Sequence, residues 1–215
     1  MPIRVSASKG YLVRLALIAA FCIGFGGYFL FDGLYTYPRQ LARGDLYRRL
    51  LDDGRLEEWS KEADAAGLGV EPADETDRKR TPWDIQFQLI IAAALALPSA
   101  YFLGLLIIYL RRWVKLTDTG LATSGGVHVP YGDIERIEKF KWEKKGIAHA
   151  VYKDGARERR ILLDDWKFQT EPMRQLMKEL EAAVGTGKIV GGPSEVEIEA
   201  RKKAQAEADP SPKDV

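Results

Sequence analysis

The chain has 215 residues and a formal net charge of +1, so its composition gives no overall attraction to nucleic acid or to an acidic substrate. Its single cysteine, Cys22, excludes an intrachain disulfide and therefore a disulfide-stapled secreted domain. Apolar blocks come first and charged, mixed sequence follows. This division predicts membrane helices followed by a small folded domain.

The first apolar block follows a basic N-terminal tail, residues 1–10, and a transmembrane helix is predicted over 11–31. Leu15–Phe31 alone is short for a span, but Tyr11–Val13 lengthen it if Arg14 extends to the headgroups. A cleaved signal peptide has the same basic start and apolar core. Because the block runs into aromatic residues without an evident small-x-small cleavage site, a retained span is favoured.

The second apolar block, Leu89–Leu110, contains no charged side chain and ends at Arg111. Roughly 20 apolar residues cross a bilayer core as a helix, so a second transmembrane helix is predicted over 85–110. Trp83 and Trp113 flank this helix at positions that suit the two interfaces. A buried core helix of a soluble protein is the alternative, which the length and the cationic end disfavour.

Both blocks carry small residues at every fourth position, which allows membrane helices to approach closely. An antiparallel pair of spans packed along these faces is therefore expected. The residues predicted to form this contact are Ala16, Ala20, Gly24, Ala92, Ala96, Ala100 and Gly104.

The segment between the spans, residues 32–84, is polar and helix-prone. Pro38 is expected to open one helix, Gly54 to end it, and a second helix to end near Gly67 or Gly69. An extended return to the membrane should follow. A helical hairpin without a ligand is favoured over a binding site here.

Residues 111–185 show short alternating runs separated by turn residues, which predicts antiparallel strands. Asp154 and Gly155 indicate a hairpin turn. In the strand before it, Phe140 and Trp142 should face the core, with the neighbouring lysines Lys139 and Lys141 in solvent.

An amphipathic helix should follow from Thr170, with an apolar stripe formed by Met173, Leu176, Met177, Leu180 and Val184. The expected fold is a membrane helical hairpin plus a small α+β domain. That domain is a bent antiparallel sheet or open barrel capped by the C-terminal helix. A flexible charged tail is expected over 186–215, holding one short helix with a Ser194/Glu197 capping box.

The motif Leu116-Thr117-Asp118 with Gly120-Leu121, followed by Val129-Pro130 and Ile134 with Ile137, resembles the bacterial pleckstrin-homology-like (PH-like) domain family. The similarity covers about a third of the chain. It implies a PH-like fold after a pair of membrane helices, a cytoplasmic location for that domain, and no catalytic residues. The long segment between the spans departs from this family pattern.

No catalytic, cofactor-binding or metal-binding residues are predicted, because His128 and His149 stand alone and no nucleophile has a partner pattern. Cations on the predicted hairpin are candidate contacts for anionic lipid headgroups or a partner protein. Interleaved glutamates make a solvated mixed-charge face the alternative, and no nucleic acid is expected. The candidate contacts are Lys141, Lys144, Lys145, Arg157, Arg159 and Arg160.

These patterns predict a non-catalytic integral protein of the inner (cytoplasmic) membrane that serves in anchoring, scaffolding or binding of a partner or lipid headgroup. An accessory subunit of a membrane enzyme or transporter complex is the alternative. Expected partners are the bilayer, anionic headgroups and either another protein or a second copy. Flanking charges are balanced, so the prediction that both termini are cytoplasmic rests on Arg111-Arg112 and on the family resemblance.

Overall fold

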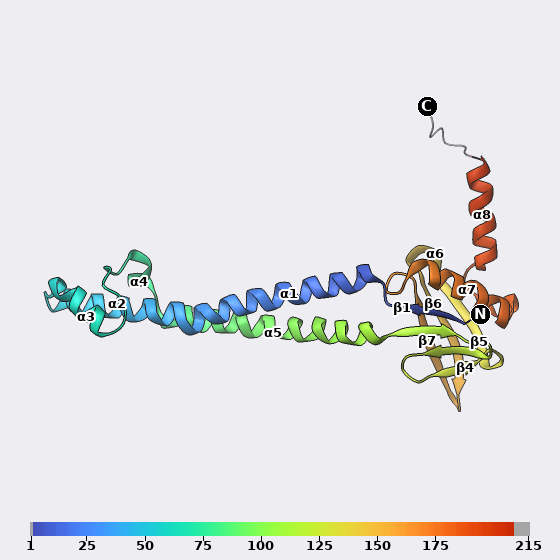
Figure 1. The fold of residues 1–215 in the computed structure, drawn as a ribbon, viewed down its shortest axis with the longest axis horizontal. Coiled ribbons are helices and arrows are strands. Elements are labelled where there is room, and N and C mark those ends of the chain that lie inside the picture. Colours follow the sequence, from blue (N-terminus) through green and yellow to red (C-terminus); the bar gives the residue numbers. More distant parts are fainter. Residues whose placement is uncertain (1, 209–215) are drawn as a thin grey trace. The chain divides into compact units, whose positions relative to one another are not determined.

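The computed structural model describes residues 2–208, which form two units. The sheet unit combines the N-terminal residues up to Arg14 with the chain from Leu105 onward. The helical unit comprises Leu15–Gly104. Elements carry the labels of Figure 1.

Two long apolar helices dominate the first half of the chain, as predicted. Helix α1 (Lys9–Phe31) continues through a π-helical turn, η1 (Asp32–Thr36), into α2 (Tyr37–Asp52), so that 44 residues form one helix. Helix α5 (Pro82–Arg111) has 30 residues and continues through Pro98. Both are long and apolar enough to cross a membrane.

Within the helical unit, the contact with α5 lies beside the predicted small-residue face of α1, whereas Ala92, Ala96 and Ala100 of the predicted α5 face line one hollow with Cys22 and Gly26 of α1. Leu15, Ala19 and Cys22 are buried on α1, and Ala92 is buried on α5 as expected. A methyl group built on Gly26 would lie 3.5 Å from Leu95 Cβ. The predicted residues Ala20, Gly24, Ala96 and Ala100 are exposed, whereas Ala16 and Gly104 are half-buried.

This displacement has a simple physical origin. Residues at i and i+4 share a helix face, but α1 carries small residues on more than one such row, including Ala19, Cys22 and Gly26. Spacing alone therefore could not select the row that contacts α5. Leu15, a large residue, is buried on the same helix, and a search for small residues passes over it.

The segment between the long helices has its own small core. Helix α2 packs with η2 (Leu56–Glu58), α3 (Trp59–Ala65) and α4 (Glu75–Lys79). A helix that ends at Asp52, before Gly54, and a second helix after it occur as predicted. The expected start of the first helix at Pro38 is wrong, because the helix continues from α1 through Pro38. The extended return is interrupted by α4, whose Asp74 and Asp77 form a capping box. The buried core residues are Leu46, Leu50, Trp59, Ala63 and Ala73.

The sheet unit contains two four-stranded sheets (Figure 1). The first has the order β1-β2-β3-β4 and the second the order β7-β6-β5-β8, with every neighbouring pair antiparallel except β5 and β8. The strands are β1 (Ile3–Ser6), β2 (Trp113–Leu116), β3 (Gly120–Thr123), β4 (His128–Pro130), β5 (Ile134–Lys141), β6 (Ile147–Asp154), β7 (Arg157–Asp164) and β8 (Ile189–Val190). Short helical turns are η3 (Tyr131–Asp133), α6 (Trp142–Lys145) and η4 (Thr186–Lys188).

Residues 1–10 were expected to form a basic tail, but Ile3–Ser6 form strand β1 and pair with β2, Val5 lying opposite Val114. Val5 is fully buried, and Ala7 continues the buried side of this strand. The alternation of Ile3, Val5 and Ala7 is a period-two signal in the sequence. This signal covers only five residues and directly precedes a long apolar helix, so it was not interpreted as a strand.

Helix α7 (Thr170–Val184) closes the core of the sheet unit, and its predicted stripe is confirmed. Met173, Leu176, Met177 and Leu180 are fully buried in one cluster with residues from both sheets. A small antiparallel-sheet domain with a C-terminal helix is therefore present. The expected burial of Trp142 is also confirmed, although this residue begins α6 rather than lying in a strand.

The predicted orientation of Phe140 and Lys139 is wrong. Phe140 is 66% exposed and Lys139 only 2% exposed. The pairing of β5 with β6 shifts register between Glu138 and Lys141, and such a shift changes which side chains face the core. Lys139 instead binds Glu181 Oε1 at 2.7 Å and Glu195 Oε1 at 2.8 Å.

The flexible tail expected over 186–215 is replaced up to residue 208 by η4, β8 and α8 (Glu195–Ala208). The predicted capping box is confirmed, since Ser194 N–H donates to Glu197 Oε2 at 2.8 Å and Glu197 N–H to Ser194 Oγ at 3.2 Å. Residues 209–215 lie outside the described part of the chain. The ion pairs of Lys139 attach the start of α8 to the core.

Candidate functional site

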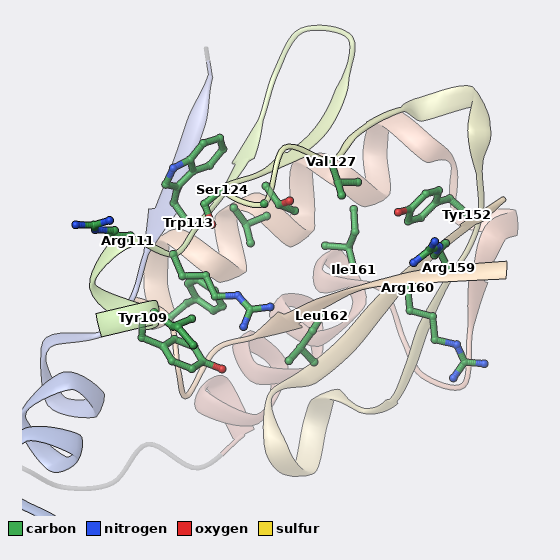
Figure 2. Close-up of a pocket in the computed structure, with 16 residues that line it drawn as sticks. Tyr109, Arg111, Trp113, Ser124, Val127, Tyr152, Arg159, Arg160, Ile161 and Leu162 are labelled. Carbon is green, nitrogen blue, oxygen red and sulfur yellow. The ribbon is translucent and has the colours of Figure 1, made fainter. Parts of the chain in front are cut away.

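A groove of about 580 Å³ lies in the sheet unit, and Figure 2 shows the residues around it. The end of α5, the start of β2, the β3–β4 turn and strand β7 form its walls. Its volume lies in the range typical of ligand sites. The lining residues are Ile108, Tyr109, Arg111, Arg112, Trp113, Val114, Thr123, Ser124, Gly125, Val127, Tyr152, Arg159, Arg160, Ile161, Leu162 and Phe168.

An aromatic cluster fixes the helix ends against this part of the sheet unit. The ring of Tyr109 lies 4.9 Å from that of Tyr11 and 6.5 Å from that of Phe168, between centroids. Tyr11 also contacts the ring of Trp166 at 5.3 Å. Two backbone hydrogen bonds hold the same segment, Ser8 N–H to the carbonyl of Lys167 and Gln169 N–H to that of Ser6.

Strand β7 contributes four consecutive lining residues, Arg159–Leu162. Side chains of a strand alternate between its two faces, so a groove lined by consecutive residues runs along the strand edge. Strand β7 is the terminal strand of its sheet and pairs only with β6. In Figure 2, Ile161 and Val127 face each other across the groove.

The rim of the groove is cationic. Arg111 and Arg112 belong to the α5 end and make no ion pair with any described residue. Arg159 contacts Asp154 at 3.3 Å and Arg160 contacts Glu158 at 3.1 Å, both among exposed side chains. Such exposed pairs are weak and solvent-screened. No aspartate or glutamate occurs among the described lining residues.

Beyond the groove, β5 and β7 carry a mixed-charge network. Arg136 binds Glu138 and Glu158, each at 2.9 Å. Hydrogen bonding by Arg136, assisted by Arg160, lowers the pKa of the exposed Glu158 carboxyl below its ordinary value. The positive charge of this face is therefore partly neutralised by its own carboxylates.

The six predicted cationic contacts divide between two places. Arg159 and Arg160 line the groove, whereas Lys141, Lys144, Lys145 and Arg157 do not. The prediction omitted Arg111 and Arg112 as site residues. Their position directly after an apolar block was the available sequence signal, but it was interpreted as the end of a span and as a signal for membrane topology.

A second cationic group surrounds the helix ends of the sheet unit. We call Lys9, Arg14, Arg111 and Arg112 the helix-end cations; all four are exposed. None has a carboxylate within ion-pair distance in residues 2–208. The Arg14 guanidinium lies 5.2 Å from the ring centre of Trp166, an indole that is 53% exposed.

The buried cluster around Lys139 is the main perturbed titratable site of the core. Desolvation raises the pKa of the Glu181 carboxyl, and the hydrogen bond from Lys139 opposes this effect. Trp142 Nε1–H and Lys139 both donate to Glu195, and Glu195 N–H donates to Glu181 Oε2. With its polar atoms bonded to one another, this cluster acts as a structural connection between β5, α7 and α8.

No cluster of histidine, cysteine, aspartate or glutamate arranged to hold a metal ion occurs among residues 2–208. Comparison with family models, with curated proteins and with solved structures finds no match to this chain.

Proposed function

We propose that the chain is a two-span, non-catalytic integral membrane protein, in which the sheet unit is a PH-like domain held at the membrane surface for anchoring, scaffolding or binding. The observation that carries this proposal is the group of exposed helix-end cations, which have no ion pair among residues 2–208 and of which Arg14 lies beside the exposed Trp166. An exposed indole and unpaired cations next to long apolar helices suit a bilayer interface.

The apolar surface of the long helices supports insertion into a bilayer. Leu17 is 65% exposed and Leu97 is 76% exposed, with Phe21 and Leu103 also exposed. In a water-soluble protein, such a continuous apolar surface would be a large unpaired patch. In a membrane, the lipid chains cover it.

Two features support a PH-like domain: two short sheets, antiparallel except for the β5–β8 pair, around one core, and the closing helix α7. Strand β1 and the β8–α8 segment are additions to the expected pattern. The family resemblance and the topology together favour a domain that works by surface contact.

Anionic headgroups are the proposed ligands of the helix-end cations. Each lysine or arginine close to an anionic surface contributes about 1 kcal/mol, so the four together favour such a surface by roughly 4 kcal/mol at low salt. On the predicted hairpin face, two of the six cations are engaged by carboxylates. The helix-end cations are therefore the better headgroup contact.

We place both termini on the cytoplasmic side of the inner membrane, as the arginine pair after α5 and the family resemblance favour. An accessory subunit of a membrane enzyme or transporter complex is the second candidate. A homo-oligomer or a protein partner is compatible with either function.

Lipid selectivity tests the proposal. The protein would be reconstituted into phosphatidylcholine bilayers containing brominated phosphatidylglycerol or brominated phosphatidylcholine, in a Trp83→Phe background. Trp59 and Trp142 are buried, so the quenching would report on Trp113 and Trp166. Stronger quenching by the anionic lipid is expected, and replacing all four helix-end cations by glutamine should abolish the preference.

The matched control replaces Lys141, Lys144, Lys145 and Arg157 by glutamine, which removes the same charge from cations that also lack ion pairs among the described residues. This control should keep the lipid preference. If it loses the preference and the helix-end variant keeps it, the headgroup contact is on the hairpin face. Release of the protein from membranes by alkaline carbonate would refute membrane insertion.

A further inference from the structure

We infer that the groove beside β7 is a docking site for an extended acidic segment of a partner protein, which adds as a strand to the free edge of β7. This inference shares Arg111 and Arg112 with the proposed headgroup contact and otherwise rests on the proposed function only in treating the sheet unit as a binding domain. Its evidence is the edge backbone, the charge of the groove rim and the apolar part of the groove lining.

The backbone register shows which groups of β7 are free. Asp154 pairs with Arg157 around the two-residue loop Gly155-Ala156, and the register continues without a shift to Ile147 and Asp164. In a two-residue hairpin the closing pair exchanges hydrogen bonds, and hydrogen-bonded and non-bonded pairs then alternate. Before the last residue of β7, Asp164, the N–H and C=O groups that point away from β6 therefore belong to Glu158, Arg160 and Leu162.

These outward groups have no backbone partner in the described part of the chain. Edge strands with free N–H and C=O groups are templates for another strand, and natural proteins often protect them by charge, by shortness or by a covering element. Strand β7 has eight residues, and a groove rather than a helix lies along Arg159–Leu162. Only its first part is protected by charged side chains.

Charge defines the class of partner. Four arginines and no carboxylate occur among the described lining residues, and Figure 2 shows Arg111 and Arg159 at opposite ends of the groove. A strand with an acidic residue at each end would meet cations at both. Electrostatic complementarity of this kind favours acidic partners and excludes basic ones.

The apolar lining of the groove defines the residues between the two acidic ends of the segment. Val114, Val127, Ile161 and Phe168 contribute this apolar surface. A strand added to β7 would direct every second side chain toward this surface, so apolar residues at alternate positions fit. A lipid headgroup has no backbone that can match the repeating N–H and C=O groups along the β7 edge, which is why a peptide is the favoured occupant.

The probe is a fluorescein-labelled heptapeptide with glutamate at both ends and alternating valine and threonine between them. Its binding to the full-length protein in detergent would be measured by fluorescence anisotropy. Saturable binding is expected, with at least about a tenfold loss when alternate amides are N-methylated or when the terminal glutamates become lysine. Equal binding of the N-methylated peptide would overturn strand addition.

Arg112→Glu and Arg159→Glu should each weaken binding by about tenfold or more, and Ser124→Trp should block the groove. Arg157→Glu is the matched control: it lies on the same strand outside the groove and should change binding less than about twofold. Thermal unfolding would confirm that each variant is folded. Binding that is insensitive to Arg112→Glu, Arg159→Glu and Ser124→Trp alike would overturn the assignment of the groove.

Short-chain phosphatidylglycerol serves as a competitor. If it displaces the peptide, and if its own binding is weakened by Arg159→Glu and by Ser124→Trp, the groove is a lipid site and the inference is wrong. No peptide binding up to about 1 mM would also overturn it. The quenching experiment on the reconstituted protein separates failure of this inference from failure of the proposed function. A preference for anionic lipid without peptide binding would refute the peptide site alone.

Discussion

Replacing Lys139 by methionine should detach the C-terminal segment from the core. Lys139 is the cation of a buried cluster, and its Nζ lies 2.7 Å from Glu181 Oε1 and 2.8 Å from Glu195 Oε1. Methionine has a similar length but no charge, so two buried carboxylates would remain facing each other. Removing one partner of a buried ion pair typically costs about 3–5 kcal/mol.

Protonation of one of the two buried carboxylates limits this loss of folding stability. Neutralising a carboxyl from the ordinary pKa of 4.5 costs about 3.4 kcal/mol at pH 7, since each pH unit is worth about 1.36 kcal/mol. Desolvation already raises the pKa of Glu181, and loss of Lys139 removes the interaction that opposes this rise. A carboxyl with a raised folded-state pKa stabilises the fold fully below its unfolded pKa, and this contribution is lost as pH rises through the folded value.

The variant should therefore be far less stable than the native protein at pH 7, and the difference should shrink by about 2–3 kcal/mol at pH 5. Hydrogen–deuterium exchange of the full-length protein in detergent measures this locally. Peptides from β8 and the start of α8 should exchange about 100–1000-fold faster at pH 7, after correction for intrinsic rates. Peptides from α2 and α3 provide the internal reference.

Lys141→Met is the matched control, because Lys141 is exposed and lies two residues after Lys139 on the same strand. It should leave exchange unchanged within about threefold. The reasoning is refuted if Lys139→Met exchanges like the control at pH 7. It is also refuted if the effect is equal at pH 5 and pH 7, because a buried-charge origin requires pH dependence.

Three substitutions test the packing of the two units. Gly44→Ala should disrupt the segment between the long helices, because the new methyl would lie 2.2 Å from the carbonyl oxygen of Asp77. A loss of native Trp59 fluorescence would show this disruption. Gly27→Ala is the control, because a methyl at Gly27 would meet no atom within 4 Å. Leu176→Asp should abolish the near-UV spectrum of the sheet unit, because it places an unpaired charge in the core at a cost above about 4 kcal/mol. Phe140→Ser should cost less than about 1 kcal/mol in thermal unfolding, since this ring is 66% exposed; a severe loss would support the core position expected from the sequence.

The sequence by itself determined the elements whose signal is long or strongly periodic. Two uninterrupted apolar blocks can only form long helices with apolar surfaces, and the stripe of α7 recurs at helical spacing. The Asp154–Gly155 turn and the Ser194–Glu197 box also followed from local chemistry, because both depend on residues close in the chain.

Only the tertiary structure decided which surfaces meet. The row of α1 that contacts α5, the pairing of β1 with β2, and the register shift that buries Lys139 all depend on residues far apart in sequence. The same holds for the groove, whose arginines come from the junction of α5 with β2 and from β7. Local patterns specify which faces are apolar, but the partner and register of each face are set by global packing, in which several local solutions compete.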